Sequence, residues 1–325
     1  MMEGMKLLPT YHPSAILHAP DERSYFPLFC FDIGKAKREA ASPELRLPKR
    51  TLLIRPPMEE ALAHLRRLHE AKRPVSFDIE TEKGRPEWYC IAFADRSEWA
   101  MCLPTHPAWG TDLAYVGYVL PPIKRLLEDA SVPKIAQNAQ FDILFLRHYH
   151  GIQTRGLIFD TMTAHHTAYP ELPKSLELLA SIYTDQPYYK DMAKIPPSLW
   201  EYNALDAAVT YECYVALEDE LKEVGNREFY QTYVLDLIDP LLDMQEKGVC
   251  VDLTKREEVA AALQEEIDDT EAEVTHTAYG WVGIQQTPDV GAEHYVGLNA
   301  RSPEQLQEYL FNVLKLPRSY LRKGE

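Results

Sequence analysis

The pattern of apolar and polar positions divides the chain into parts of different character. Between residues 51 and 225, short runs rich in β-branched and aromatic residues alternate with longer segments of helical period. The strand-like runs are TLLI, VSFDIET, WYCIAFADRS, EWAMCLPT, KIAQN and LIFD, and the second to fourth of them predict a three-stranded meander. Because strands and helices are interleaved, we expect an α/β domain here, with a mixed sheet flanked by helices.

The helical segments begin and end at recognisable signals. Leu62, Leu65 and Leu68 share one face of a helix in MEEALAHLRRLHEAKR, and PPIKRLLEDAS predicts a helix with proline in its first turn. Gly151 and Gly225 each stop a helix. From residue 226 to 325 the pattern is helical only, so we expect an all-α appendage after the α/β domain. The proline-containing residues 41–50 predict a linker between this domain and residues 1–40.

Composition and charge narrow the class of protein. The 325 residues are 46% hydrophobic and 26% charged, as in ordinary soluble proteins. The apolar runs are too short for a membrane span and the N-terminus does not resemble a signal peptide, so we expect a cytoplasmic protein, in the host cytoplasm if phage-encoded. The five scattered cysteines form no CxxC pair, which favours reduced thiols. A net charge of −16 argues against a protein that binds nucleic acid along its whole length.

The strand VSFDIET carries two acids on one face. Side chains alternate along a strand, so Phe77 and Ile79 share one face while Asp78 and Glu80 share the other. Two like charges repel, and removing them from water raises the cost further. A bound cation would reverse the sign of that energy, so the pair predicts a metal site.

Further oxygen ligands are found in two helices. Tyr202 and Asp206 are at positions i and i+4 of one helix, and Asp142 falls in the first turn of another that is otherwise apolar. Taken singly, Asp142 has a plain explanation as a charge favoured by the helix dipole, Asp206 as a solvated or capping acid, and Tyr202 as a half-buried ring. Together with Asp78 and Glu80 they predict an all-oxygen site suited to two divalent ions, Mg²⁺ or Mn²⁺.

Three motifs carry a resemblance to a known superfamily. DIET, NAQFD and YNALD resemble the exonuclease motifs of the DEDD superfamily in its tyrosine branch, found in proofreading domains of family A DNA polymerases and in ribonuclease D-like enzymes. The resemblance covers about residues 74–223, and the segment FDTMTAHHTAYPELPKSLELLASIYTDQPYYKD is similar to the bacteriophage polymerase version. It implies a ribonuclease H-like fold for residues 51–225.

The resemblance also implies roles for the site residues. Asp78, Glu80 and Asp206 would hold the metal that activates water, and Asp78 would also reach a second metal with Asp142 near it through water. Tyr202 would orient the attacking water. These five residues are therefore the expected catalytic residues, and the four acids are the expected metal ligands.

Two further residues are expected to contact the substrate. The resemblance implies that Asn138 contacts the substrate strand and that Thr81 touches the terminal nucleotide. The implied reaction is hydrolysis of the 3′-terminal phosphodiester of single-stranded DNA, with release of nucleoside 5′-monophosphates. A ribonuclease D-like RNA 3′-processing nuclease and a non-catalytic exonuclease-fold scaffold remain the alternatives.

The two ends of the chain show weaker resemblances. LIDPLLDMQEKGVCVDL and LNARSPEQLQEYLFNVLKLP are similar to the start of a family A polymerase thumb, so residues 226–325 are expected to be a partial thumb or a helical appendage of other purpose. No fingers or palm motif follows, so we expect the polymerase core, a possible partner, to be encoded in cis or separately. LLPTYHPSAILHAPDERSYFPLFCFDIGKAK resembles the end of a family 4-like uracil-DNA glycosylase. His12 would then match a loop histidine, or residues 1–40 are a remnant in which it is idle. A glycosylase encoded in cis or separately is therefore a second possible partner.

Overall fold

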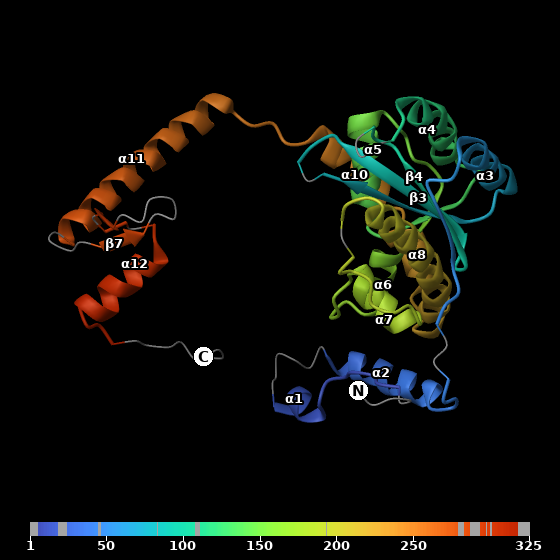
Figure 1. Cartoon of the computed structure of the whole chain (residues 1–325), viewed down its shortest axis with the longest axis horizontal. Coiled ribbons are helices and arrows are strands. Elements are labelled where there is room, and N and C mark those ends of the chain that lie inside the picture. Colours follow the sequence, from blue (N-terminus) through green and yellow to red (C-terminus); the bar gives the residue numbers. More distant parts are fainter. Residues whose placement is uncertain are drawn as a thin grey trace. The chain divides into compact units, whose positions relative to one another are not determined.

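The structure, a computed structural model, describes residues 6–18, 25–44, 47–82, 84–107, 111–192, 194–278, 283–286, 293–296, 298–299 and 301–317. The chain divides into two compact units, Met1–Gly248 and Val249–Glu325, and each is described by itself (Figure 1). The acid-bearing motifs all belong to the first unit.

The first unit is built on a six-stranded mixed sheet with the strand order β1-β4-β3-β2-β5-β6. Strands β2, β3 and β4 are antiparallel neighbours, which confirms the predicted meander, and β1, β5 and β6 add parallel pairings at its two sides. Strand β2 is therefore central and pairs with both β3 and β5. The strands are β1 Thr51–Ile54, β2 Val75–Thr81, β3 Trp88–Arg96, β4 Trp99–Pro104, β5 Lys134–Ala136 and β6 Leu157–Asp160.

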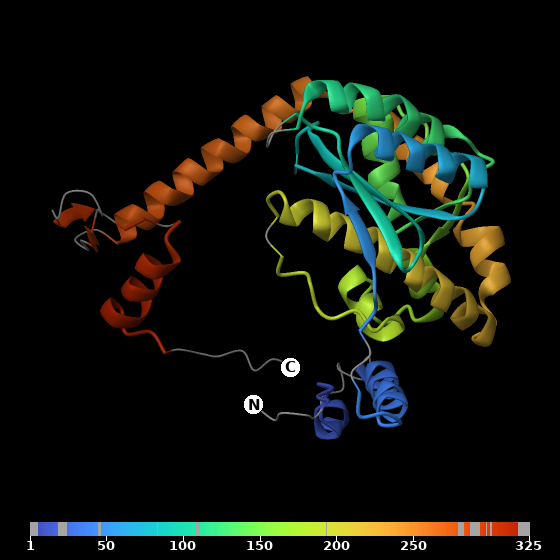
Figure 2. The ribbon, with the colours of Figure 1, turned by 45° about the vertical axis from the view of Figure 1, so that its right-hand side comes forward.

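Helices flank this sheet, as Figures 1 and 2 show. The helices of the first unit are α1 Pro13–His18, α2 Phe26–Glu39, α3 Met58–Ala71, α4 Leu113–Glu128, α5 Ala139–His150, α6 Thr161–Ala168, α7 Leu176–Tyr183, α8 Ser198–Glu223, α9 Arg227–Phe229 and α10 Ile238–Lys247, with a π-helical turn at Tyr230–Val234. The prediction for α4 was wrong at its start, because the helix begins at Leu113 and the prolines Pro121 and Pro122 lie inside it. Asp112 caps that earlier start by accepting a hydrogen bond from the Ala114 amide at 2.9 Å.

The two faces of the sheet bury different kinds of side chain. On one face, Phe77 and Ile79 of β2 join the large aliphatic residues of α3, α4 and α5 in one core. On the other, α8 packs against strands β3 and β4 through small residues. These small residues are Ala204, Ala207 and Ala208 of the helix and Cys90, Ala92, Ala94, Ala100 and Cys102 of the strands. Because small side chains allow a close approach, α8 lies directly on the acid-bearing face of β2.

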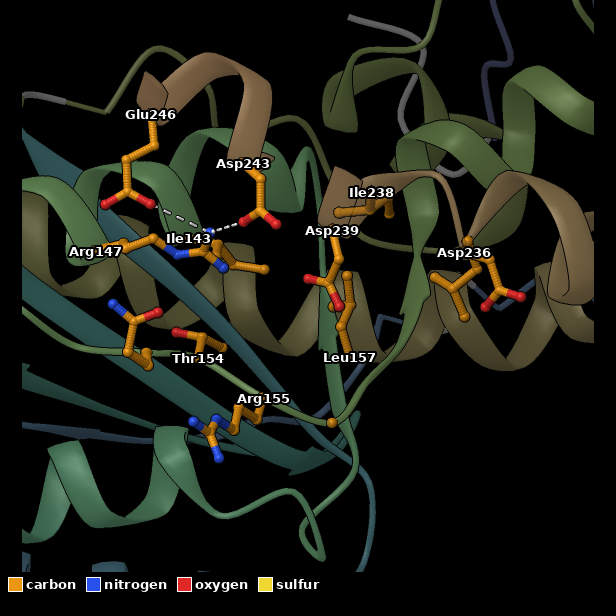
Figure 3. A pocket seen from close by; sticks show the side chains of 13 residues that line it. Ile143, Arg147, Thr154, Arg155, Leu157, Asp236, Ile238, Asp239, Asp243 and Glu246 are labelled. Carbon is orange, nitrogen blue, oxygen red and sulfur yellow. Dashed lines mark hydrogen bonds and ion pairs between the residues drawn. The ribbon is translucent and has the colours of Figure 1, made fainter. Parts of the chain in front are cut away.

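Helix α10 belongs to the first unit and not to the appendage. The side chains of Ile238 and Leu242 are buried in the same core as α5. Arg147 of α5 forms ion pairs with Asp243 at 2.9 Å and Glu246 at 3.5 Å, in the pocket drawn in Figure 3. The first compact unit therefore extends to Gly248, beyond the predicted boundary at residue 225, because the apolar face of this helix is used against the α/β core.

The second unit is mainly helical. It contains α11 Leu253–Thr277, α12 Pro303–Gln307 and a π-helical turn at Glu308–Val313. It also contains an antiparallel pair of strands, β7 Gly283–Gln286 and β8 Glu293–Val296. The all-α prediction missed this pair, since four-residue strands are too short to show a period of two clearly against helical neighbours.

Helix α2 contacts the rest of the first unit near α7. Lys35 donates hydrogen bonds to the backbone oxygens of Ser181 at 3.1 Å and Thr184 at 2.8 Å. His12 is exposed and hydrogen-bonds with Ser14 at 2.6 Å. Residues 19–24 of the glycosylase-like segment lie outside the described residues, and that resemblance stays a prediction. In the part of the chain that the structure describes, no helix is long and apolar enough to cross a membrane.

Candidate active site

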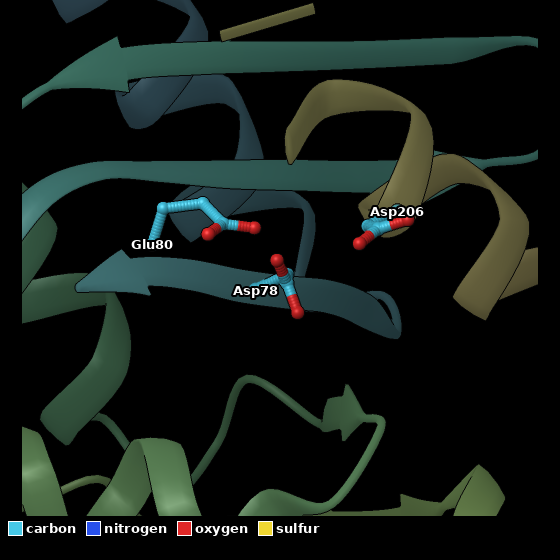
Figure 4. Close-up of side chains that lie close together, drawn as sticks. All are labelled: Asp78, Glu80 and Asp206. Carbon is cyan, nitrogen blue, oxygen red and sulfur yellow. The ribbon is translucent and has the colours of Figure 1, made fainter. Parts of the chain in front are cut away.

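Three of the predicted acids converge between the sheet and α8. Asp78 and Glu80 project from β2 and Asp206 from α8, and each offers a carboxylate oxygen that lies within 4.8 Å of the others. Figure 4 shows the three carboxylates facing one another across the gap between the strand and the helix. The structure thus brings together residues that are up to 128 positions apart in the sequence.

The period of the strand explains why the acids face α8. Phe77 and Ile79 point into the core on the opposite face, as the alternation predicts. Ser76, on the acid-bearing face, donates a hydrogen bond to the backbone oxygen of Ala207 at 2.7 Å. This bond fixes the helix turn that follows Asp206 against the strand.

Burial and mutual repulsion disfavour charge in the cluster. Burial raises the pKa of Asp78 well above its usual range, and the charges of Asp206, Asp142 and Glu80 raise it further. Burial, followed by the charge of Asp206, raises the pKa of Glu80 to about 7. The nearby ammonium groups of Lys194 and Lys190 act in the opposite direction. A group of carboxylates held together at such a cost is typical of a functional site.

Asp142 lies close to the cluster without joining it. Its side chain is 4% exposed at the start of α5. Burial, then the charges of Glu80, Asp160 and Asp206, raises its pKa well above the usual range. Its Oδ2 atom is buried and has no hydrogen-bond partner among the described residues. The oxygen is therefore a ligand atom without a protein donor, which fits the more distant role that the resemblance implied.

A second buried acid, Asp160, holds the segment that carries Asn138 and Asp142. Its carboxylate accepts hydrogen bonds from the backbone amides of Asn138 at 3.0 Å, Ala139 at 2.9 Å and Met162 at 2.9 Å. Asn138 adopts a left-handed backbone conformation, with φ of 60°, where the chain turns from β5 into α5. The sequence pattern places Asp160 at the end of a predicted strand but does not indicate this role.

Tyr202 belongs to a cluster of polar groups around Asp206. Lys190 donates to the Tyr202 hydroxyl at 2.9 Å and to the two carboxylate oxygens of Asp206 at 2.6 and 2.8 Å. Tyr189 donates to Asp206 Oδ1 at 2.5 Å. Burial and the charge of Asp206 raise the pKa of Tyr202, so its hydroxyl stays protonated. No motif or period in the sequence indicated Lys190 or Tyr189, because both lie outside regular secondary structure in PYYKD.

Asn203 positions the first acid. Its side-chain amide donates to Asp78 Oδ2 at 2.6 Å and to the Asp78 backbone oxygen at 3.2 Å. Asn203 lies within the motif YNALD, but the motif pattern assigns roles only to Tyr202 and Asp206. Thr81 follows Glu80 at the end of β2, where the pairing with β3 shifts register at a bulge. Its contact with a nucleotide, like that of Asn138 with the substrate strand, stays a prediction.

The donor set fits a hard divalent cation. Carboxylate oxygens are the ligands that Mg²⁺ and Mn²⁺ prefer, and here three of them share one small volume while the unpartnered Asp142 Oδ2 lies nearby. A cation at this position would remove the repulsion that raises the pKa of Asp78 and Glu80.

A mixed sheet with an acid cluster between its central strand β2 and helix α8 is the arrangement that the three motifs predicted for a nuclease domain. A family model described as 3′–5′ exonuclease matches residues 57–222, half of the chain. The chain belongs to this 3′–5′ exonuclease family, in the branch that accompanies family A DNA polymerases.

Individual relatives agree with this assignment. DNA polymerase I of Synechocystis sp. is 27% identical over 329 residues, which cover 94% of this chain and 31% of the relative. The DNA polymerase of Bacillus phage SP01 is 25% identical, with 95% and 38% covered. The POL domain of Pol1 from M. smegmatis has a TM-score of 0.54 at 20% identity, with 84% of this chain and 42% of that chain covered, which shows a shared fold. The matched region spans about a third of the length of these two polymerase relatives.

Proposed function

We propose that this chain is a metal-dependent 3′–5′ exonuclease that removes nucleoside 5′-monophosphates from single-stranded DNA 3′ ends. Its role would be proofreading for a family A DNA polymerase. The observation that carries the proposal is the convergence of Asp78, Glu80 and Asp206 within 4.8 Å, inside the residues that the exonuclease family model matches. The polymerase core is supplied in cis or by another polypeptide.

The acids and the bound ions have complementary parts in the reaction. Asp78, Glu80 and Asp206 would hold the cations, with Asp142 beside them. Two divalent ions of the Mg²⁺ or Mn²⁺ type, when bound there, would supply a lowered pKa for the attacking water and positive charge beside the reacting phosphate. That charge also explains how a protein with a net charge of −16 could act on nucleic acid, since positive charge is then needed only at the site.

The other side chains of the site position the reacting groups or donate hydrogen bonds to them. Tyr202 keeps its proton and orients the attacking water as a hydrogen-bond partner. Asn203 fixes the Asp78 carboxylate from α8, so that strand and helix present their oxygens in one arrangement. Asn138 and Thr81 contact the strand and its terminal nucleotide.

The test is a degradation assay on a 5′-labelled single-stranded DNA oligonucleotide, with Mg²⁺, with Mn²⁺ and with EDTA. We expect one-nucleotide shortening and release of mononucleotides only with a divalent ion. Asp78→Ala and Asp206→Ala should abolish it, whereas Asp219→Ala, an exposed acid on the same helix as Asp206, should not.

A matched RNA oligonucleotide separates the alternatives. Faster shortening of RNA than of DNA would replace the proposal by a ribonuclease D-like activity. A wild-type protein that shortens neither substrate with either ion would show that the fold is kept as a non-catalytic scaffold.

A further inference from the structure

Lys190 lies at the centre of the candidate site, although it belongs to none of the three acid-bearing motifs. It is in the segment between α7 and α8, and its side chain is only 15% exposed. Its ammonium group contacts both oxygens of Asp206 and the hydroxyl of Tyr202. One lysine thus bridges the carboxylate and the hydroxyl to which the proposed function assigns separate tasks.

The contacts of Lys190 are the contacts that a metal ion at Asp206 requires. Both Asp206 oxygens accept from Lys190, and Oδ1 accepts from Tyr189 as well. A divalent ion on the same carboxylate would meet a positive charge at hydrogen-bond distance, and like charges so close repel strongly. Lys190 and a divalent ion therefore compete for Asp206.

Two aromatic rings lie against the ammonium group of Lys190. Its ammonium lies 4.5 Å from the ring centroid of Tyr202 and 4.9 Å from that of Tyr189, so two aromatic faces hold a cation beside the acid. A lysine that leaves Asp206 while staying against these rings remains next to the Tyr202 hydroxyl. The proposed function places the attacking water at that hydroxyl, and the reacting phosphodiester must lie beside the attacking water.

We propose that Lys190 is a catalytic residue that exchanges partners, pairing with Asp206 before ions bind and with a phosphate oxygen of the terminal phosphodiester afterwards. This inference rests on the proposed exonuclease function. Its chemistry is electrostatic: the ammonium group stabilises the negative charge that develops on the phosphate. It also offsets the charge of the acid cluster while no ion is bound.

The proposal predicts two effects of opposite sign in Lys190→Met, which keeps an unbranched apolar side chain and removes the charge. Titration with Mn²⁺ alone, followed by calorimetry in the absence of DNA, should show binding about tenfold tighter than in the wild type, because the competitor is gone. At saturating Mn²⁺, the single-turnover rate on 5′-labelled single-stranded DNA should fall by about a hundredfold, because the phosphate loses a cation.

Two further variants control the result. Lys190→Arg keeps the charge and should retain Mn²⁺ affinity close to that of the wild type with an intermediate rate, and it serves if the methionine variant does not fold. Lys222→Met removes an exposed lysine near the end of α8, where it pairs with Asp219, and should change neither quantity.

The outcomes separate this inference from the function on which it rests. Mn²⁺ affinity that is unchanged or weaker in Lys190→Met, or an unchanged rate, would overturn the role of Lys190 while wild-type hydrolysis still supported the function. A wild type that binds Mn²⁺ and hydrolyses no nucleic acid would overturn the function itself.

Discussion

Replacing Glu80 by glutamine removes one negative charge from the acid cluster, and we expect this change to stabilise the protein when divalent ions are absent. Burial and the charge of Asp206 raise the pKa of Glu80 from 4.5 to about 7. The native state therefore holds the proton more tightly than the unfolded chain does, so this group lowers stability as the pH rises through that interval. This loss of stability is absent well below pH 4.5 and complete well above about pH 7.

The magnitude follows from the size of this rise. Each pKa unit corresponds to about 1.4 kcal/mol, so the cost in mildly alkaline solution is on the order of 3 kcal/mol. Glu80→Gln should recover about that free energy of unfolding in EDTA at about pH 8, and almost none at about pH 4. Excess Mn²⁺ should reverse the order of stability, because the wild type binds the ion better and is stabilised by binding.

Urea unfolding of both proteins at the two pH values, with EDTA or Mn²⁺, measures these differences. The matched control is Glu70→Gln, on the exposed surface of α3, which should follow the wild type throughout. An equal or lower stability of Glu80→Gln in EDTA at the higher pH would refute the reasoning, because it would show that the cluster imposes no electrostatic cost.

Three other substitutions test the scaffold of the site. Leu242→Ala should lower the free energy of unfolding by about 2–5 kcal/mol in urea denaturation, because the side chain is fully buried against the α/β core; a smaller loss would place α10 outside that core. Asp160→Asn should lower the free energy of unfolding by about 1–3 kcal/mol and reduce exonuclease activity. The two carboxylate oxygens of Asp160 accept hydrogen bonds from the backbone amides of Asn138 and Ala139, and an amide side chain has only one acceptor oxygen. Unchanged stability would contradict this prediction. Asn203→Ala should weaken Mn²⁺ binding about 10- to 100-fold in calorimetry, because Asp78 loses the donor that orients it, and unchanged affinity would argue against that role.

The sequence predicted the features that depend on local periodicity. The alternation in VSFDIET was sufficient to place Phe77 and Ile79 in the core and Asp78 and Glu80 on the other face, as the structure shows. The glycine signals also located the ends of α5 and α8 correctly, since Gly151 and Gly225 both have the positive φ that favours glycine.

Features that depend on tertiary contacts were missed or misplaced. Helix α10 has an apolar face that fits an appendage as well as the α/β core, and only its packing with α5 decides between them. Lys190 comes from an irregular segment, so no period indicated which way its side chain points. The predicted start of α4 is too late, because proline is common in the first turn of a helix. In the structure, helical turns that bury Val116 and Val119 in the core precede the two prolines.

The convergence of Asp78, Glu80 and Asp206 on bound cations, with Asp142 beside them, is the central claim, and the most direct test is anomalous X-ray diffraction from crystals of the wild-type protein soaked in Mn²⁺. The account predicts a Mn²⁺ peak in contact with carboxylate oxygens of Asp78, Glu80 and Asp206, with a second peak on the side of Asp142, and no such peaks in crystals of Asp78→Ala. Crystals in which Mn²⁺ binds elsewhere, or in which Lys190 stays on Asp206 with no ion beside it at saturating Mn²⁺, would contradict the account.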